Sequence, residues 1–291
     1  MTANRQTPPR ADRNARVLGL GAMKRLGDAH VVVLGLGGVG SFTAEALARA
    51  GVGRLTLVDG ERVDETTTNR QLHALDGEFG RWKAEVLAER LLRVAPGARI
   101  EPACVAYGPD TADRLVPPGI SYVVDAMDTV VAKLHVIARC LDLAIPVVTS
   151  LGAARRLDPT AVQVTDLSET HTDQLAKDVR KYLRRRHGIS AAATLGVKAV
   201  WSLEEARETL SLPGDEDGIP GTRPRSEGRR RREPRCHGSV VFVTGVFGLV
   251  AAGAVVQDLG RVAPRTPRVL AEAEQARRRK RGISRGTRRD G

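Results

Sequence analysis

The sequence predicts an α/β protein built on a doubly wound, mostly parallel sheet. From residue 28 onward, short runs rich in β-branched residues alternate with longer amphipathic stretches. A glycine-rich turn follows the first of these runs and opens the first amphipathic stretch. Because strand and helix alternate strictly, the sheet is expected to be parallel and covered by helices on both faces.

The elements follow this alternation in order. Strands are expected at 31–34, 55–58, 100–104, 122–126 and 147–149. The helices between them are expected at 39–50, 83–94 and 130–143. A turn signal, Asp158-Pro159-Thr160, then precedes a strand at 161–165, which we expect to extend the sheet in the antiparallel direction. The helix expected at 172–186 ends in a basic run, which suits the negative end of a helix dipole.

The positive charge is concentrated in three segments. The formal net charge is +12, and residues 1–16, 211–236 and 261–291 hold 22 of the 46 Lys and Arg residues but 9 of the 34 acids. We therefore predict a flexible basic N-terminal arm at 1–16, a nucleotide-binding domain at 17–260 with a disordered Arg/Pro/Gly insert at 211–236, and a basic C-terminal tail at 261–291. The net charge favours a polyanion partner, whereas the 3% aromatic content argues against a stacking platform for single strands. For the basic arms themselves we favour solvated tails over a contribution to nucleic-acid binding by counterion release.

Cysteine usage and apolar runs indicate a cytoplasmic protein. Cys104, Cys140 and Cys236 are too few and too far apart for a disulfide framework or a paired metal site. The first 16 residues have no apolar core typical of a secretory signal. Residues 240–256 are uncharged, at the lower limit of a bilayer span, and we favour a buried helix over membrane association there.

A nucleotide site is predicted at residues 35–40, whose sequence is GLGGVG. The glycines Gly35, Gly37, Gly38 and Gly40 lie between a strand and a helix, and Asp59 closes the next strand. Glycines let the backbone approach a phosphate, the helix N-terminus supplies free N–H groups, and the acid accepts the ribose hydroxyls, as in Rossmann-like folds. A dehydrogenase has the same fingerprint for NAD, so the loop predicts a nucleotide without specifying which one.

Charged residues beyond Asp59 favour ATP chemistry. Asn69 and Arg70 follow the second strand, Lys83 opens the next helix, and Asp125 and Asp128 end the fourth strand. All of them fall at the carboxyl edge of a parallel sheet, where ligands bind. Attack at the α-phosphate of ATP builds negative charge that Arg and Lys stabilise, and a carboxylate such as Asp128 can hold Mg²⁺.

Four segments resemble the ubiquitin-activating-enzyme superfamily: GLGGVGSFTAEALARAGVGRLTLVD, TTTNRQLHAL, GRWKAEVLAERL and YVVDAMDTVVAK. The segments NRQLHAL, IPVVTSLGAARRLDPTAVQVTDL and LGVKAVWSLEEA are most similar to its tRNA threonylcarbamoyladenosine dehydratase branch. The resemblance covers residues 15–210 and, more loosely, 236–260. It implies an ATP-dependent enzyme that adenylates the threonine carboxylate of N6-threonylcarbamoyladenosine in tRNA and closes it into a ring.

The resemblance also implies roles for individual residues. The four glycines form the phosphate loop, Asp59 binds the ribose, Asn69, Arg70 and Lys83 hold the triphosphate, and Asp128 carries Mg²⁺. Arg16, just before the first helix, matches an arginine that relatives insert into the neighbouring subunit's active site, which implies a homodimer. A solvated basic N-terminus is the alternative for Arg16.

The chain departs from this pattern at several points. Thr67 replaces an Asn that contacts phosphate in relatives, and residues 152–157 are basic where the branch is glycine-rich. The chain has no Cys-x-x-Cys pair, so the structural zinc of carrier-protein adenylyltransferases is not expected. Cys236 beside His237 is a candidate reactive thiol, although free Cys is more often a buried apolar residue; His73 is interpreted as structural rather than as a general base.

Three alternatives to this function are compatible with the sequence. One is adenylation of a ubiquitin-like sulfur-carrier protein, which would bring sulfur-transfer partner proteins. Another is an NAD-dependent oxidoreductase, which the glycine fingerprint alone permits. The third is a non-catalytic scaffold, which applies if Thr67 disables phosphate binding.

Overall fold

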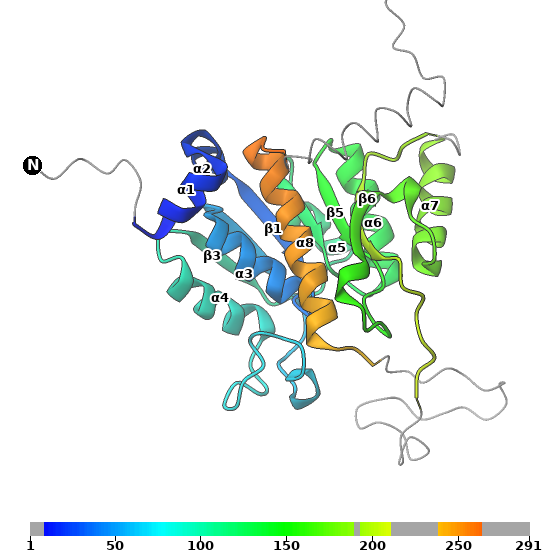
Figure 1. Ribbon diagram of the computed structural model, residues 1–291, viewed down its shortest axis with the longest axis horizontal. Coiled ribbons are helices and arrows are strands. Elements are labelled where there is room, and N and C mark those ends of the chain that lie inside the picture. The colour runs from blue at the N-terminus through cyan, green and yellow to red at the C-terminus, as the bar shows by residue number, and fades with distance from the viewer. Residues whose placement is uncertain (1–8, 189–192, 211–237, 264–291) are drawn as a thin grey trace, which may run out of the picture. The chain divides into compact units, whose positions relative to one another are not determined.

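The computed structural model describes residues 9–188, 193–210 and 238–263, and within them one seven-stranded sheet forms the centre of the fold (Figure 1). The strand order is β3-β2-β1-β4-β5-β7-β6, and only β6 runs antiparallel, against β7. The strands are β1 His30–Leu34, β2 Arg54–Val58, β3 Arg99–Ala103, β4 Tyr122–Asp125, β5 Val147–Ser150, β6 Val162–Asp166 and β7 Lys198–Ser202. The doubly wound sheet with an antiparallel extension is thus confirmed, whereas the sequence analysis did not predict β7.

Helices cover both faces of the sheet because side chains of the buried strands alternate between two apolar cores. Val31 and Val33 belong to one core and Val32 and Leu34 to the other. The first core is covered by α1 Asp12–Leu18, α2 Leu20–Asp28, α3 Gly40–Ala50, α4 Lys83–Val94 and α8 Val241–Gly260. The second is covered by α5 Pro109–Leu115, α6 Val130–Asp142 and α7 Gln174–His187.

Short 3-10 turns complete the described elements: η1 Pro9–Ala11, η2 Glu65–Thr67, η3 Pro159–Ala161 and η4 Leu167–Glu169. Predicted and observed bounds of the long elements differ by one or two residues, as expected where helix ends and strand ends are defined by a single hydrogen bond.

The part of the predicted N-terminal arm that the structure describes is helical. Arg16 lies inside α1 and not before the first helix, and its guanidinium pairs with Asp12 one turn earlier at 2.9 Å. Helix α1 ends at Gly19, whose φ of +84° only glycine adopts without strain. The helical structure therefore begins within the predicted arm at 1–16.

Helix α8 contains the long apolar run, and it packs in the core as predicted. By length and hydropathy it is the one helix of the described residues that could cross a membrane. Figure 1 shows it beside α3, over the sheet. A Cβ at Gly248 would lie 2.4 Å from the Val39 carbonyl oxygen and 2.8 Å from Phe42 Cβ, so the two helices approach as closely as glycine allows.

The remaining basic segments fall largely outside the described residues. Residues 1–8, the insert at 211–236 with Cys236, and residues 264–291 of the tail are not described. The predicted division of the chain into arm, domain, insert and tail stays a prediction.

Candidate nucleotide-binding site

The glycine loop forms a tight turn between β1 and α3. Gly35 has a φ of +83°, and a Cβ at Gly40 would lie 1.8 Å from the Gly35 carbonyl oxygen. Any side chain at either position would therefore open the turn. Because α3 begins at Gly40, the loop presents the free N–H groups of a helix N-terminus at the carboxyl end of β1, a site suited to phosphate.

Three segments distant in sequence pack against this loop. A Cβ at Gly38 would lie 2.9 Å from Thr244 Oγ1 of α8 and 3.1 Å from Arg70 Cγ. A Cβ at Gly35 would lie 2.8 Å from the carbonyl oxygen of Ala126, just after β4. The glycine loop therefore meets α8, the loop with Arg70 and the end of β4 at one place, where the strand order reverses between β1 and β4.

Asp59 lies at the end of β2 and faces the glycine loop. Its two carboxylate oxygens accept hydrogen bonds from the backbone N–H groups of Leu36 (2.7 Å) and Glu61 (2.8 Å). Each oxygen keeps a further lone pair for a ligand hydroxyl. Burial raises the pKa of Asp59 above its ordinary value, and the two hydrogen bonds oppose that shift.

Asn69 and Arg70 lie together in the segment after η2. Arg70 Nη1 donates to the Thr66 carbonyl oxygen (3.1 Å) and to Asn69 Oδ1 (2.9 Å). Asn69 Nδ2 donates to the carbonyl oxygen of Ser239, just before α8. The described hydrogen bonds of Arg70 use only Nη1, so Nη2 and Nε remain as donors beside the glycine loop.

Lys83 was expected to hold the triphosphate, and in the structure its ammonium pairs with Glu61. It is buried, with 3% of its surface exposed, and its Nζ lies 2.5 Å from Glu61 Oε2. As the first residue of α4 it is a cation at the positive end of a helix dipole, which makes the Glu61 carboxylate its stabilising partner. A triphosphate that recruits Lys83 must compete with Glu61, whose side chain is mostly exposed.

Thr67 does not offer a free hydroxyl in place of the family's Asn. The residue is buried, and its Oγ1 donates to the Asp64 carbonyl oxygen at 2.6 Å. The hydroxyl thus closes the turn that precedes Asn69 and Arg70.

The two acids at the end of β4 have separate roles. Asp128 is exposed and, within the described residues, forms no ion pair; Thr129 Oγ1 lies 3.4 Å from its carboxylate. Asp125 is fully buried, and its Oδ2 accepts hydrogen bonds from Lys133 Nζ and Thr149 Oγ1, both at 2.6 Å. An exposed carboxylate beside a phosphate loop fits Mg²⁺, which proteins hold through one or two carboxylates together with substrate phosphates.

Lys133 was not among the site residues predicted from the sequence. Its side chain is completely buried, and beyond Asp125 it donates to Thr149 Oγ1 (3.2 Å) and the Ser150 carbonyl oxygen (2.9 Å). It thereby ties the ends of β4 and β5 together beneath the site. A lysine in the otherwise apolar first turn of α6 was the available signal, since a cation is unfavourable there unless an acid pairs with it.

The nucleotide site lies at the carboxyl ends of the parallel strands, and Arg16 lies near their amino ends. The N-terminal elements contact the last turns of α3 and α4: Asn14 Nδ2 of α1 donates to the Arg49 carbonyl oxygen, and Arg10 Nη1 of η1 donates to that of Val94. The glycine loop lies at the other end of α3 (Figure 1). The fold therefore does not bring Arg16 to the nucleotide site of its own chain.

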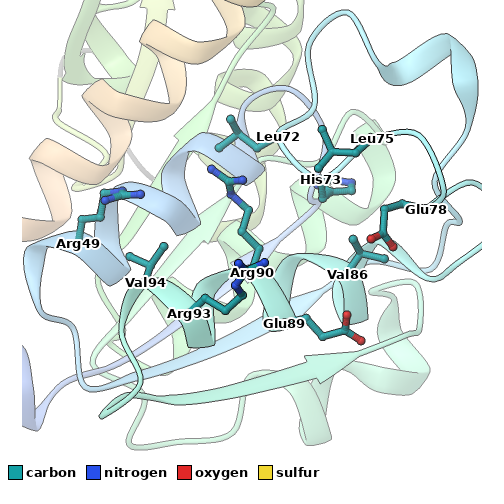
Figure 2. A pocket seen from close by; sticks show the side chains of 10 residues that line it. All are labelled: Arg49, Leu72, His73, Leu75, Glu78, Val86, Glu89, Arg90, Arg93 and Val94. Carbon is teal, nitrogen blue, oxygen red and sulfur yellow. The ribbon is translucent and has the colours of Figure 1, made fainter.

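A cavity of about 490 Å³ lies behind the Arg70 segment, between α3 and α4. Figure 2 shows His73 at its wall beside Arg90. His73 is 1% exposed, and within the described residues neither ring nitrogen has a hydrogen-bond partner. Burial, reinforced by the charges of Lys83 and Arg90, lowers the pKa of His73 to about 4. Its ring is therefore neutral at pH 7.

Three further residues, Arg156, Cys140 and Cys104, are structural. Arg156 of the basic 152–157 segment is buried, donates to the Glu204 carbonyl oxygen at 3.0 Å and pairs with Asp173 at 3.6 Å. Burial raises the pKa of the Cys140 thiol to about 12 and also raises that of Cys104, so neither is a reactive thiolate.

Known proteins match the chain over most of its length. The tRNA threonylcarbamoyladenosine dehydratases of Escherichia coli and Bacillus subtilis are both 39% identical to it, over 84% and 85% of this chain and 91% and 93% of theirs. The crystal structure of the Escherichia coli dehydratase in complex with ATP superimposes with a TM-score of 0.73 at 36% identity, covering 91% of this chain and 96% of that one. The family model that matches residues 11–281 is that of the ThiF family, and the chain belongs to this family.

Proposed function

We propose that this protein is an ATP-dependent tRNA threonylcarbamoyladenosine dehydratase, which cyclises N6-threonylcarbamoyladenosine in tRNA with loss of water. The observation that carries this proposal is the match to named dehydratases along more than nine-tenths of their own length, at 39% identity. The likeness thus extends past the nucleotide-binding half of the sheet, through β5, β7, β6 and α8.

ATP is the nucleotide of this proposal, and not NAD. The Escherichia coli relative has been crystallised with ATP and with AMP, the substrate and product of an adenylation. In this chain, the N–H groups at the start of α3 bind the phosphates and the free lone pairs of Asp59 accept the ribose hydroxyls.

The reaction has two steps. The threonine carboxylate of the modified nucleoside attacks the α-phosphorus of ATP, the bond to the bridging oxygen breaks, and pyrophosphate leaves with that electron pair. A nucleophilic group of the same modification then attacks the mixed anhydride, loses its proton and displaces AMP, which carries away the carboxylate oxygen. Because this nucleophile is already tethered beside the anhydride, orientation supplies much of the acceleration of the second step.

The cations of the site stabilise the first step. Negative charge increases on the α-phosphate and on the leaving pyrophosphate, and Arg70 beside the glycine loop presents Nε and Nη2 to it. Lys83 contributes once the nucleotide draws its ammonium away from Glu61, and Asn69 holds Arg70 in place through its Oδ1. Asp128 holds Mg²⁺, which when bound shares the charge of the phosphates.

The active unit of this proposal is a homodimer. Arg16 lies at the amino edge of the sheet, far from the glycine loop of its own chain, and is mostly exposed. It can therefore assist adenylation only in a neighbouring copy, in trans.

Incubation of the full-length protein with ATP and tRNA that carries the modification tests the function directly. We expect mass spectrometry of the nucleosides to show loss of one water, with one AMP formed per nucleoside converted. Absence of dehydration, together with ATP–pyrophosphate exchange that responds only to a carrier protein ending in Gly-Gly, would replace this proposal by carrier adenylation.

Variants of the phosphate-binding cations test the site. Arg70→Ala and Lys83→Ala should each lower kcat for dehydration by about 100-fold or more, because each removes a positive group from the developing charge. Arg62→Ala is the matched control, since Arg62 belongs to the same segment but stacks on Trp82, 3.9 Å from its ring centre. An unchanged kcat in the first two variants would remove both residues from the site.

A further inference from the structure

Helix α7 carries a high density of positive charge. Its 14 residues, Gln174–His187, contain six Lys and Arg residues and one acid. On α3 and α4, by contrast, Arg49 and Arg90 both pair with Glu45. The charge of α7 therefore needs a reason beyond the general solubility of the surface.

Half of these cations are engaged or shielded by the fold. Arg186 pairs with Asp142 of α6 at 3.2 Å, and Arg180 donates to Thr170 Oγ1. Arg184 is half-buried. These residues fix α7 to its neighbours.

The other three cations form what we call the α7 stripe: Lys177, Lys181 and Arg185. All three are exposed, and within the described residues none of them forms an ion pair. Their spacing of four residues places them along one face of the helix in steps of about 6 Å. The opposite face is buried, with Ala176, Val179 and Leu183 in the core.

Helix α7 begins at the carboxyl ends of the sheet strands, the same end of the sheet as the nucleotide site. Asp173, the N-cap of α7, accepts hydrogen bonds from the Ala176 N–H and from the Gly152 N–H, both at 3.0 Å. Gly152 follows the carboxyl end of β5, the strand next to the one that carries Asp125. From there α7 runs beside α6 toward the opposite edge of the sheet, so the stripe leads away from the site (Figure 1).

We propose that the α7 stripe binds the phosphate backbone of the substrate tRNA, outside the nucleotide that reacts. This inference rests on the proposed function. A row of unpaired cations fits an extended polyanion, whose bound counterions are released on contact. The one aromatic residue among these cations, Tyr182, is half-exposed and offers no row of stacking rings, so the stripe positions the RNA without reading its bases.

The triple variant Lys177→Gln/Lys181→Gln/Arg185→Gln of the full-length protein tests this surface. We expect KM for modified tRNA to rise about tenfold or more, and the slope of log affinity against log salt to become shallower by about 2 to 3. KM for ATP and kcat at saturating tRNA should stay unchanged, because no atom of the stripe belongs to the nucleotide site.

The variant Lys24→Gln/Arg93→Gln/Arg99→Gln is the matched control. It removes the same charge from exposed side chains of α2, α4 and β3. Of these, Lys24 pairs with Asp28 and Arg99 with Glu101, and exposed ion pairs of this kind contribute little to stability. This variant should leave KM for tRNA within about twofold of wild type while thermal unfolding shows both triple variants folded.

The outcomes distinguish failure of the proposed function from failure of the proposed tRNA-binding surface. Wild-type protein that does not dehydrate modified tRNA refutes the proposed function. Active wild-type protein with an unchanged KM and salt slope in the stripe variant refutes the surface alone, as do equal losses in stripe and control variants. If the stripe variant keeps wild-type tRNA kinetics but no longer binds an acidic protein that the wild type binds, the stripe is a protein-binding surface and the proposal is wrong.

Discussion

Lys133 supports the ends of β4 and β5 below the nucleotide site through its ion pair with Asp125. Both side chains are fully buried at 2.6 Å, and the backbone N–H of Met127 also donates to Asp125 (3.2 Å). The pair therefore fixes the start of the loop that carries Asp128. Each of the two buried charges would lower the stability of the fold if it stood alone, and each is tolerated because the other neutralises it.

Replacing Lys133 alone should lower the free energy of unfolding more than replacing Lys133 and Asp125 together. Lys133→Met leaves the Asp125 carboxylate buried without its cation, and should lower the free energy of unfolding by about 3 to 5 kcal/mol. The double variant Lys133→Met/Asp125→Asn should recover much of that loss in urea unfolding. Equal destabilisation of single and double variants would show that Lys133 acts through packing and not through charge.

His73 gives a prediction in pH. In the folded chain its ring stays neutral down to about pH 4, whereas in the unfolded chain it takes up a proton near pH 6.5. Between these values the unfolded state binds more protons, so stability falls as the pH falls through this window, by up to about 3 kcal/mol.

The variant His73→Asn removes that titration. Between pH 7 and pH 4, the free energy of unfolding of the wild type should therefore fall more than that of the variant. Urea unfolding at several pH values measures it, and parallel curves for the two proteins would contradict a buried neutral His73.

At the scale of elements, the contact between α3 and α8 couples the apolar core to the nucleotide site. Gly248 lies against Val39 and Phe42 at the start of α3, and Thr244 one turn earlier lies against Gly38. Helix α8 thus supports the glycine loop from the side opposite β4. Gly248 is required for this approach, and a Cβ at Gly245 would lie 3.2 Å from the Phe42 ring, which would have to shift slightly to accommodate it.

Gly248→Ala should therefore affect stability and ATP binding together. The added methyl group pushes α8 away from α3, which should lower the free energy of unfolding by about 1 to 3 kcal/mol. It should also raise KM for ATP because the glycine loop shifts. Gly253→Ala is the matched control: a Cβ there meets nothing within 4 Å, so the variant should gain about 0.5 to 1 kcal/mol from helix propensity. The same loss in both variants would contradict close packing at Gly248.

At the scale of the whole molecule, the position of Arg16 predicts shared active sites. Arg16→Ala and Asp128→Asn should each be nearly inactive alone. After mixing under conditions of subunit exchange, heterodimers contain one complete site, and about a quarter of the wild-type activity should return for random exchange in a closed two-fold dimer. No recovery on mixing, or full activity of Arg16→Ala alone, would exclude a role in trans.

The sequence by itself determined the order and type of most elements and the residues of the phosphate loop. It did so because strand and helix periodicity, glycine at a turn of positive φ, and acids at strand ends are local signals. The short strand β7, with five residues between irregular segments, lacked such a signal, and so did the helical state of Arg16.

Only the tertiary structure decided which charges meet. Glu61 and Lys83 are 22 residues apart and Glu45 and Arg90 are 45 apart, while Lys177, Lys181 and Arg185 remain without an ion pair in the described residues. The crossover connections bring particular helix ends to particular strand ends, and sequence spacing does not specify which acid arrives beside which base. For this reason the nucleotide site was visible in the sequence, whereas the Glu61 partner of Lys83, the buried Lys133 and the α7 stripe were not.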